Sequence, residues 1–171
     1  MDNRDDKSKQ WSQLLGKIHD IKFAMLTTED EDGYLHSRPM ATLEEDSEGT
    51  LWFFTGKSSH KSHEIDRNPR VNLSYIAGDK DTYLSVAGEG HLVEDAARAK
   101  KLWNPLMKAW FPKGLEDPEL ALLRVDVDEA EYWDVASKKM TTLFHFGKSL
   151  LGAVNPMASN GHGTIRPDRD L

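Results

Sequence analysis

The stretch of residues 51–76 constrains the fold of this chain more than any other. It opens with an apolar run over residues 51–54, Leu-Trp-Phe-Phe, which has the length and composition of a buried strand. Turn residues follow, and one of the two serines at 58–59 stands where a helix N-cap belongs. Asn68-Pro69 ends that helix, because the residue before a proline is pushed out of the helical region. Apolar and polar residues then alternate over 71–75, which predicts a second strand with one polar face.

The start of the predicted helix gathers groups that bind anions. The first turn of a helix carries partial positive charge and unpaired backbone N–H donors. The same turn adds hydroxyl donors, an imidazole and an ammonium group, from Ser58, Ser59, His60 and Lys61. This combination predicts a site for a phosphate monoester. The alternative is a capped surface helix whose lysine is solvated.

Composition excludes several classes of protein. A chain of 171 residues with 38% apolar and 30% charged residues is expected to form one globular domain over residues 1–171, with its core at about 10–135. The net charge of −7 predicts no attraction to nucleic acid or to anionic membranes. The absence of cysteine excludes disulfides and thiolate metal sites. With neither a signal core nor an apolar run of about 18 residues, we expect a cytoplasmic protein.

Short strands separated by turns dominate the rest of the chain. The sequence predicts strands over residues 23–28, 34–43, 82–93, 122–128 and 130–135, helices around 11–18, 95–102 and 143–154, an acidic turn at 44–49, and a loose tail from residue 155. Gly88 and Gly90 interrupt the long strand and predict a bulge or sharp bend, as at the corner of a barrel. We therefore expect a β-rich α+β fold built on an antiparallel barrel.

Pro39 lies inside the second predicted strand. Proline cannot donate to a hydrogen-bonded ladder, so this strand belongs at an edge or a bulge. The segment of residues 37–42 can then present free main-chain groups and an arginine to something other than a neighbouring strand. We expect Arg38 to face a ligand rather than the core, and the alternative is a plain edge strand.

The remaining polar residues form no recognised catalytic or metal motif. His60 and His63 are three positions apart with Glu64 adjacent, whereas a zinc-protease helix needs His-Glu-x-x-His. No nucleophile elbow, P-loop or dinucleotide fingerprint is present. We assign no metal site and no catalytic acid, base or nucleophile. Trp110 and Phe111, in a proline-broken aromatic segment, are more typical of a core but are also candidates for the wall of a site.

Several segments, taken together, resemble the FMN-binding split barrels related to pyridoxamine 5′-phosphate oxidase. The likeness is carried by Ser-Arg-Pro-Met-Ala-Thr at 37–42, Leu-Trp-Phe-Phe-Thr at 51–55, and Ser-Ser-His-Lys-Ser-His-Glu-Ile at 58–65 with Asn-Pro-Arg-Val at 68–71. Trp-Phe-Pro at 110–112 and Glu-Tyr-Trp-Asp at 131–134 are similar to the general stress protein branch of that family. The order and spacing of these motifs are more specific than any one of them.

The resemblance implies a homodimer of six-stranded antiparallel split β-barrels with flanking helices and FMN at the subunit interface. Carried over residue by residue, it implies that the flavin ring and ribityl chain lie beside Arg38, Pro39, Met40, Ala41 and Thr42. It implies further flavin contacts from Phe54 and Thr55, and a phosphate held by Ser59, His60 and Lys61. The phosphate residues agree with those found above from the helix start.

The implied function is that of an FMN-dependent oxidoreductase of unknown substrate, linked to stress response. True pyridoxamine 5′-phosphate oxidases carry a C-terminal Trp-x-Arg-Leu-x-Pro-like segment, and the tail at 163–171 has no tryptophan, so vitamin B6 oxidation is not expected. One alternative is a flavin-binding or redox-sensing stress protein without turnover. Another is a barrel that binds haem or a deazaflavin, for which His36 or His91 would be the axial-ligand candidates.

Overall fold

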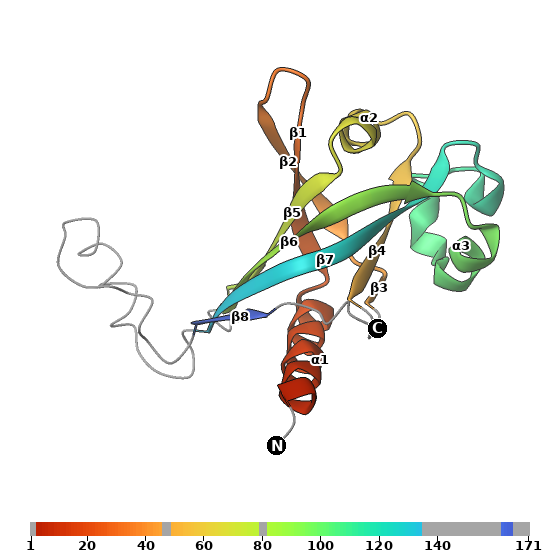
Figure 1. Ribbon diagram of the computed structural model, residues 1–171. Coiled ribbons are helices and arrows are strands. Elements are labelled where there is room, and N and C mark those ends of the chain that lie inside the picture. Colours follow the sequence, from red (N-terminus) through yellow and green to blue (C-terminus); the bar gives the residue numbers. More distant parts are fainter. Residues whose placement is uncertain (1–2, 46–48, 79–81, 135–161, 166–171) are drawn as a thin grey trace.

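The computed structural model describes residues 3–45, 49–78, 82–134 and 162–165, and its backbone is a strongly curled antiparallel sheet flanked by helices (Figure 1). Its elements, in chain order, are α1 (Asn3–Ile21), β1 (Phe23–Glu29), β2 (Leu35–Ala41), β3 (Glu44–Glu45), β4 (Thr50–Gly56), α2 (His60–Arg67), β5 (Arg70–Ala77), β6 (Thr82–Val93), α3 (Ala96–Leu102), the 3₁₀ turns η1 (Pro105–Ala109) and η2 (Gly114–Glu116), β7 (Leu120–Asp134) and β8 (His162–Ile165).

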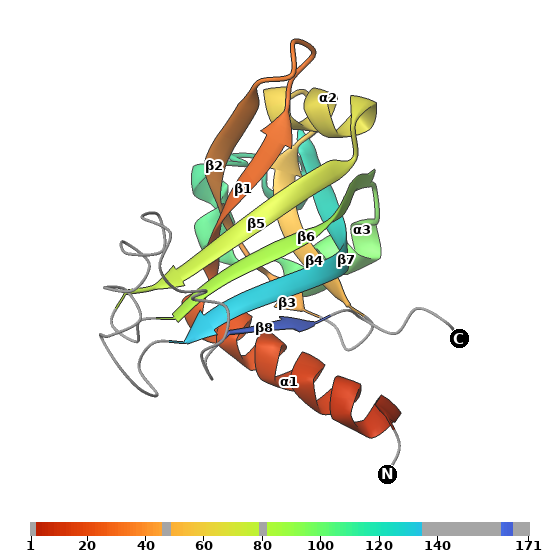
Figure 2. The same cartoon turned by 60° about the vertical axis from the view of Figure 1, so that its left-hand side comes forward.

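The sheet curls because its two end strands are consecutive in the chain. The strand order is β2-β1-β5-β6-β7-β4-β3, with β8 added to β7, and every pairing is antiparallel. Only residues 42–43 separate the end of β2 from the start of β3. A flat sheet would hold these two strands at opposite edges, so the six long strands must wrap into a split barrel, as Figure 2 shows. The predicted barrel is confirmed.

The inner face of the barrel holds the main core, and α1 and α2 lie at opposite ends of it (Figure 1). Leu26, Leu73 and Val125 come from three different strands and are fully buried there. α1 adds Leu14 and Ile18, which are also buried, as the i, i+3, i+4, i+7 pattern predicts.

β4 is buried on both of its faces. Leu51 and Phe53 belong to the main core, whereas Trp52 and Phe54 belong to a second apolar cluster on the outside of the barrel. α3 and η1 build the other side of this second cluster with Ala99, Leu102 and Met107, and Phe111, just after η1, completes it. This arrangement explains why residues 51–54 are apolar without alternation.

The long strand β6 bends where it was expected to. The register between β6 and β7 shifts between Ala87 and Gly88, which is a bulge. A Cβ atom on Gly88 would lie 2.3 Å from the backbone oxygen of Asp126, so only glycine fits. Helix α3 likewise starts as predicted, since the side chain of its N-cap, Asp95, accepts from the backbone N–H of Arg98 at 2.9 Å.

Three of the predicted elements differ from those observed. The strands expected at 122–128 and 130–135 are one strand, β7, because the bulge absorbs the irregular residue without ending the ladder. The acidic turn begins with a short strand, β3, since Glu44 and Glu45 pair with β4. The tail from residue 155 was expected to be loose, but residues 162–165 pair with β7 as β8. The helix predicted at 143–154 lies outside the described residues.

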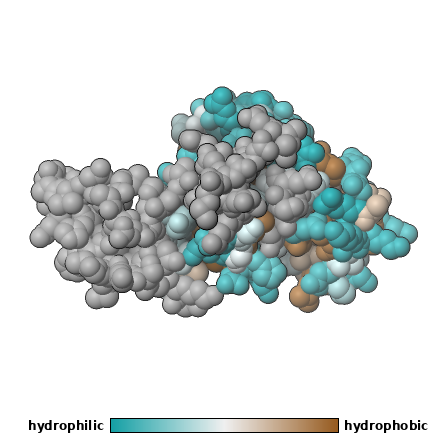
Figure 3. Space-filling view, turned by 60° about the horizontal axis from the view of Figure 1, so that its bottom comes forward, coloured by the Kyte–Doolittle hydropathy of each residue, from teal (hydrophilic) through white to brown (hydrophobic). Residues whose placement is uncertain are grey.

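Several large apolar side chains remain on the surface. Phe23, Met25 and Ile76 lie on the outer side of β1 and β5 and are 64%, 40% and 60% exposed. Trp110 is 70% exposed, although its neighbour Phe111 is buried. On the face drawn in Figure 3, hydrophobic spots are scattered among hydrophilic residues.

Candidate anion-binding site at the start of helix α2

The turn between β4 and α2 is held from within by serine hydroxyls. The buried Ser62 hydroxyl donates to the carbonyl of Gly56 at 2.7 Å and shares a hydrogen bond with the Ser59 hydroxyl at 2.8 Å. Ser59 is the N-cap, as predicted, but its side chain caps no backbone N–H because it is engaged with Ser62. Within the described residues no acceptor meets the backbone N–H groups of His60 and Lys61, so two donors of the first turn stay available.

Glu119, just before β7, anchors the same turn from outside. Its side-chain Oε2 accepts from the backbone N–H of Ser58 at 3.0 Å and from the Ser58 hydroxyl. Its backbone oxygen accepts from the N–H of Lys57 at 2.8 Å. The hydrogen bonds from the hydroxyl and the N–H of Ser58 lower the pKa of Glu119. Ser58 therefore stabilises the turn, because both its N–H and its hydroxyl are bonded to Glu119. The groups that could contact a ligand begin at Ser59.

Lys61 is the cation of this site. Its side chain is half-buried and makes no ion pair or hydrogen bond with any residue that the structure describes. Burial lowers the pKa of Lys61, the positive charge of Arg38 lowers it further, and the negative charge of Glu64 raises it in part. Glu64 compensates the charge of Lys61 only in part, so a bound anion would stabilise the ammonium group.

Arg38 is paired within the protein, on the inner side of the barrel. Its guanidinium lies at the α2 end of the barrel, where it donates to Glu64 Oε2 at 3.0 Å and to the buried hydroxyl of Thr28. Arg38 lies two residues before the buried Met40, so its side chain is on the same inward face of β2 and meets α2. That it faces a ligand stays a prediction. β2 itself is an edge strand, as Pro39 predicted.

The other residues implied on β2 and β4 are distributed over both sides of the sheet. Met40 is buried in the main core, and the Thr42 hydroxyl shares a hydrogen bond with that of Tyr75 at 2.9 Å. Pro39 is exposed and Ala41 is half-buried. These side chains therefore do not line one common surface.

Phe54 and Thr55 point to opposite faces of β4, so their side chains do not face the same space. The Phe54 ring packs edge-on against Trp103 and Phe111, with centroids 5.8 Å and 6.3 Å apart. The Thr55 hydroxyl oxygen is buried and has no hydrogen-bond partner among the described residues. A buried hydroxyl without a partner is unfavourable by itself, and a polar ligand group beside the β4–α2 turn would satisfy it.

Three residues that hold the site, Glu64, Thr28 and Glu119, were not among the predicted site residues. Glu64 follows Lys61 by three positions, so helical spacing places both on one face and was a usable signal. Thr28 and Glu119 approach the turn from distant parts of the chain, and only the strand register brings them there.

The histidines considered as haem ligands have carboxylate partners instead. His36 is exposed, with Nε2 2.7 Å from Oδ2 of Asp30. His91 lies 3.8 Å from Asp126 and 4.0 Å from Glu89. Among the residues described, no group of three or more His, Asp or Glu side chains is arranged to hold a metal ion.

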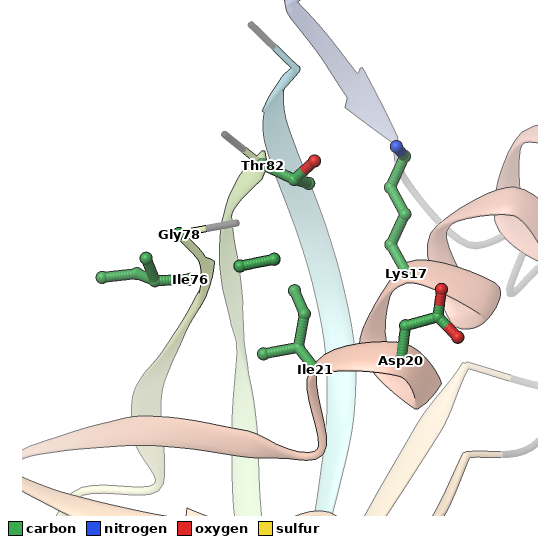
Figure 4. Close-up of a pocket in the computed structure, with 7 residues that line it drawn as sticks. Lys17, Asp20, Ile21, Ile76, Gly78 and Thr82 are labelled. Atoms are coloured by element: carbon green, nitrogen blue, oxygen red, sulfur yellow. The ribbon is translucent and has the colours of Figure 1, made fainter. Parts of the chain in front are cut away.

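A cavity of about 270 Å³ lies at the other end of the barrel, between the last turn of α1 and the ends of β5 and β6 (Figure 4). Lys17, Asp20 and Ile21 contribute its α1 wall, and Thr82 lies opposite. This cavity is separate from the α2 site, because α1 and α2 cap opposite ends. None of the helices in the described part of the chain combines the length and apolarity needed to cross a bilayer.

The curled six-stranded sheet with helices at its two ends defines the class: a split-barrel protein. Comparison with known sequences makes this specific, since the model of the family "Pyridoxamine 5′-phosphate oxidase like" matches residues 9–156. The chain belongs to this family.

Its relatives include general stress proteins. Protein bli-3 of Neurospora crassa is 35% identical over 133 residues, which cover 68% of this chain and 64% of that protein. General stress protein 26 of Bacillus subtilis is 30% identical over 146 residues, which cover 84% of this chain and 99% of that one. The crystal structure of a general stress FMN/FAD binding protein from Xanthomonas citri has a TM-score of 0.64 at 33% identity, covering 81% of this chain and 94% of that one.

Proposed function

We propose that this chain binds FMN and that the flavin phosphate lies at the start of α2. The observation that carries the proposal is Lys61, a half-buried ammonium group without a partner in the described structure, next to two free backbone N–H donors. A helix N-terminus with a lysine is a recurrent phosphate site. The name of the Xanthomonas citri protein, which binds FMN/FAD, supports a flavin as the molecule that carries the phosphate.

The residues at the site fit a phosphorylated flavin. Lys61 would neutralise the phosphate, the backbone N–H groups of His60 and Lys61 would donate to its oxygens, and Ser59 lies beside them. The unpartnered Thr55 hydroxyl, one residue before the turn, would gain an acceptor or donor from the ligand. Exposed His60 adds positive charge only when protonated, so the lysine is the main electrostatic contact.

We further propose that the protein is a flavin-dependent oxidoreductase linked to stress response, with FMN at the interface of a homodimer. The flavin ring accepts and donates electrons, so the chain need only bind it, orient it and control its access to water. The exposed apolar side chains of Phe23, Met25 and Ile76 on the outer side of the barrel support a partner there, because such a surface gains stability when covered.

Titration of the purified chain with FMN and with riboflavin tests the binding proposal. We expect a flavin absorption spectrum and tighter binding of FMN than of riboflavin, because only FMN reaches Lys61 with a phosphate. Equal affinities, or a Soret band in place of the two flavin bands, would refute it. Reduction of the bound flavin by NADH or NADPH, with turnover when an acceptor is added, separates an oxidoreductase from a flavin-binding sensor.

Light scattering tests the dimer independently of turnover. We expect a dimer at micromolar concentration with flavin bound. A flavin-loaded monomer would show that one chain completes the site alone.

A further inference from the structure

Glu119 binds the turn that precedes α2 through both its side chain and its backbone. Its carboxylate accepts from the N–H and the hydroxyl of Ser58, 61 positions earlier in the chain. Its backbone oxygen accepts from the N–H of Lys57. The next backbone donor, the N–H of Ser59, is bonded to the carbonyl of Gly56 at 3.2 Å. Three consecutive N–H groups, at residues 57–59, are therefore paired within the protein.

The free donors of the turn begin only after these three residues. The N–H groups of His60 and Lys61 meet no acceptor among the described residues, so an anion finds its donors beside the Lys61 ammonium group and not earlier in the turn. This separation depends on Glu119. Without its carboxylate, the N–H and the hydroxyl of Ser58 would be released, and the turn could change shape or offer the anion a second set of donors.

The structure holds Glu119 rigidly beside the turn. The β4–β7 ladder ends at the pair of Gly56 and Leu120, so Glu119 is the first residue beyond it. The carboxylate of Asp117 accepts from the backbone N–H of Glu119 at 3.1 Å and from that of Lys113 at 3.2 Å, which fixes the loop before β7. The Glu119 side chain is exposed and belongs to neither apolar cluster, so its contribution lies in its bonds to the turn.

We propose that Glu119 is a positioning residue of the anion site, which holds the β4–α2 turn in the shape that offers a phosphate the backbone donors of His60 and Lys61. Glu119 does not contact the phosphate, because its carboxylate is bonded to Ser58 and like charges repel. The two adjacent serines thus have different roles: Ser58 is held by Glu119, and Ser59 begins the ligand site. This inference rests on the proposed phosphate site and adds a residue that acts on it without touching the ligand.

The experiment compares four chains: the unchanged protein, Glu119→Ala, Glu119→Gln and Glu116→Ala. The readout is the ratio of FMN affinity to riboflavin affinity, which cancels general damage to the fold. Alanine removes both side-chain bonds to Ser58, whereas glutamine keeps an oxygen acceptor for Ser58 and removes only the charge. Glu116→Ala is the matched control, since Glu116 is an exposed carboxylate three positions earlier that bonds to none of the residues described. The backbone bond between Glu119 and Lys57 remains in every variant.

We expect Glu119→Ala to lower the ratio by about fivefold, because the phosphate must then order a turn that was ordered beforehand. Riboflavin has no phosphate, so its affinity should change little. Glu119→Gln should rescue the site, with a ratio that falls by no more than about twofold or rises, since the bonds to Ser58 remain and a negative charge near the phosphate is gone. Glu116→Ala should leave the ratio unchanged.

Three results would overturn the inference. An unchanged ratio in Glu119→Ala would make Glu119 a surface contact without effect on the site, and equal losses of FMN and riboflavin affinity would make it a support of the fold in general. A loss in Glu119→Gln as large as that in Glu119→Ala would show that the charge acts and not the bonds. Lys61→Met is the separate check on the phosphate site. If it leaves the ratio unchanged, the proposed function fails and this inference with it; if it lowers the ratio while Glu119→Ala does not, only this inference fails.

Discussion

Replacing Lys61 by methionine should weaken FMN binding while making the apo-protein more stable. Methionine retains most of the apolar stem and removes the ammonium group. In the apo-protein that group is half-buried and has no partner among the described residues, so its charge is unfavourable. With FMN bound, the same charge meets the phosphate.

The magnitude on the binding side follows from burial. A fully exposed ion pair contributes less than about 1 kcal/mol, or about fivefold in affinity. A hydrogen bond to a charged group contributes about 1.5–3 kcal/mol when it is partly shielded from water, as Lys61 is. We therefore expect FMN affinity to fall by roughly ten- to a hundredfold, and riboflavin affinity to stay unchanged.

The sign on the stability side follows from the lowered pKa of Lys61. Because the pKa is lower in the folded than in the unfolded chain, the unfolded chain binds more protons between the two values, and stability rises with pH through that window. At neutral pH the charged lysine therefore destabilises the apo-protein, and Lys61→Met should raise its melting temperature. The rise should shrink as the pH approaches 10.5, where the unfolded lysine also loses its charge.

Fluorescence titration with both flavins and thermal unfolding without ligand measure the two effects. Lys57→Met is the matched control, since Lys57 lies in the same turn but pairs with Glu94 at 2.9 Å. It should change the flavin ratio little and should not stabilise the apo-protein. Equal losses of FMN and riboflavin affinity for Lys61→Met, or a lower melting temperature, would refute the reasoning and make Lys61 a structural residue.

Three further predictions concern the frame of the barrel and its acid stability. Gly88→Ala should destabilise the protein by about 2 kcal/mol or more in urea unfolding, because the new methyl group meets a β7 carbonyl oxygen at 2.3 Å, whereas Gly16→Ala, with open space around it, should not be destabilising. Lys22→Gly should stabilise by about 1 kcal/mol, because Lys22 has φ of 64° at the end of α1, and a lower melting temperature would contradict this. Burial raises the pKa of Glu64, but the hydrogen bond from Thr28 and the charge of Arg38 lower it by more, so the ionised carboxylate stabilises the fold. The stability of the protein should therefore fall as the pH drops below about 4.5 and through the lowered pKa of Glu64. Glu64→Gln should remove this part of the acid dependence.

Local signals predicted the elements well because each depended on a few adjacent residues. Asn68 ends α2 as the following proline requires, Gly88 marks the bulge, and Asp95 caps α3. β8 had no such signal, because a segment of only four residues becomes a strand only when β7 offers an edge to pair with.

The candidate site was predictable only in part. The sequence located the α2 start and its lysine, because helix geometry concentrates those groups within one turn. It gave no sign that Arg38 would pair with Glu64, 26 positions later in the chain, or that Glu119 would hold the turn. A contact between side chains far apart in the sequence produces no pattern among the neighbouring residues, so the sequence alone does not predict it.

The position of β7 has a consequence during synthesis on the ribosome. β4 has β3 and β7 as its ladder neighbours, and Phe53 pairs with Leu123, 70 positions later. At a synthesis rate of roughly 5–20 residues per second, about 4–14 s pass between the synthesis of residues 51–54 and that of the β7 residues that pair with them. β1, β2, β5 and β6 can pair meanwhile, since those neighbours are made early. The nascent chain thus exposes an apolar strand without its long ladder partner for seconds. Residues 51–54 are therefore the segment where we expect a chaperone to bind, and where premature release of the chain would lead to aggregation.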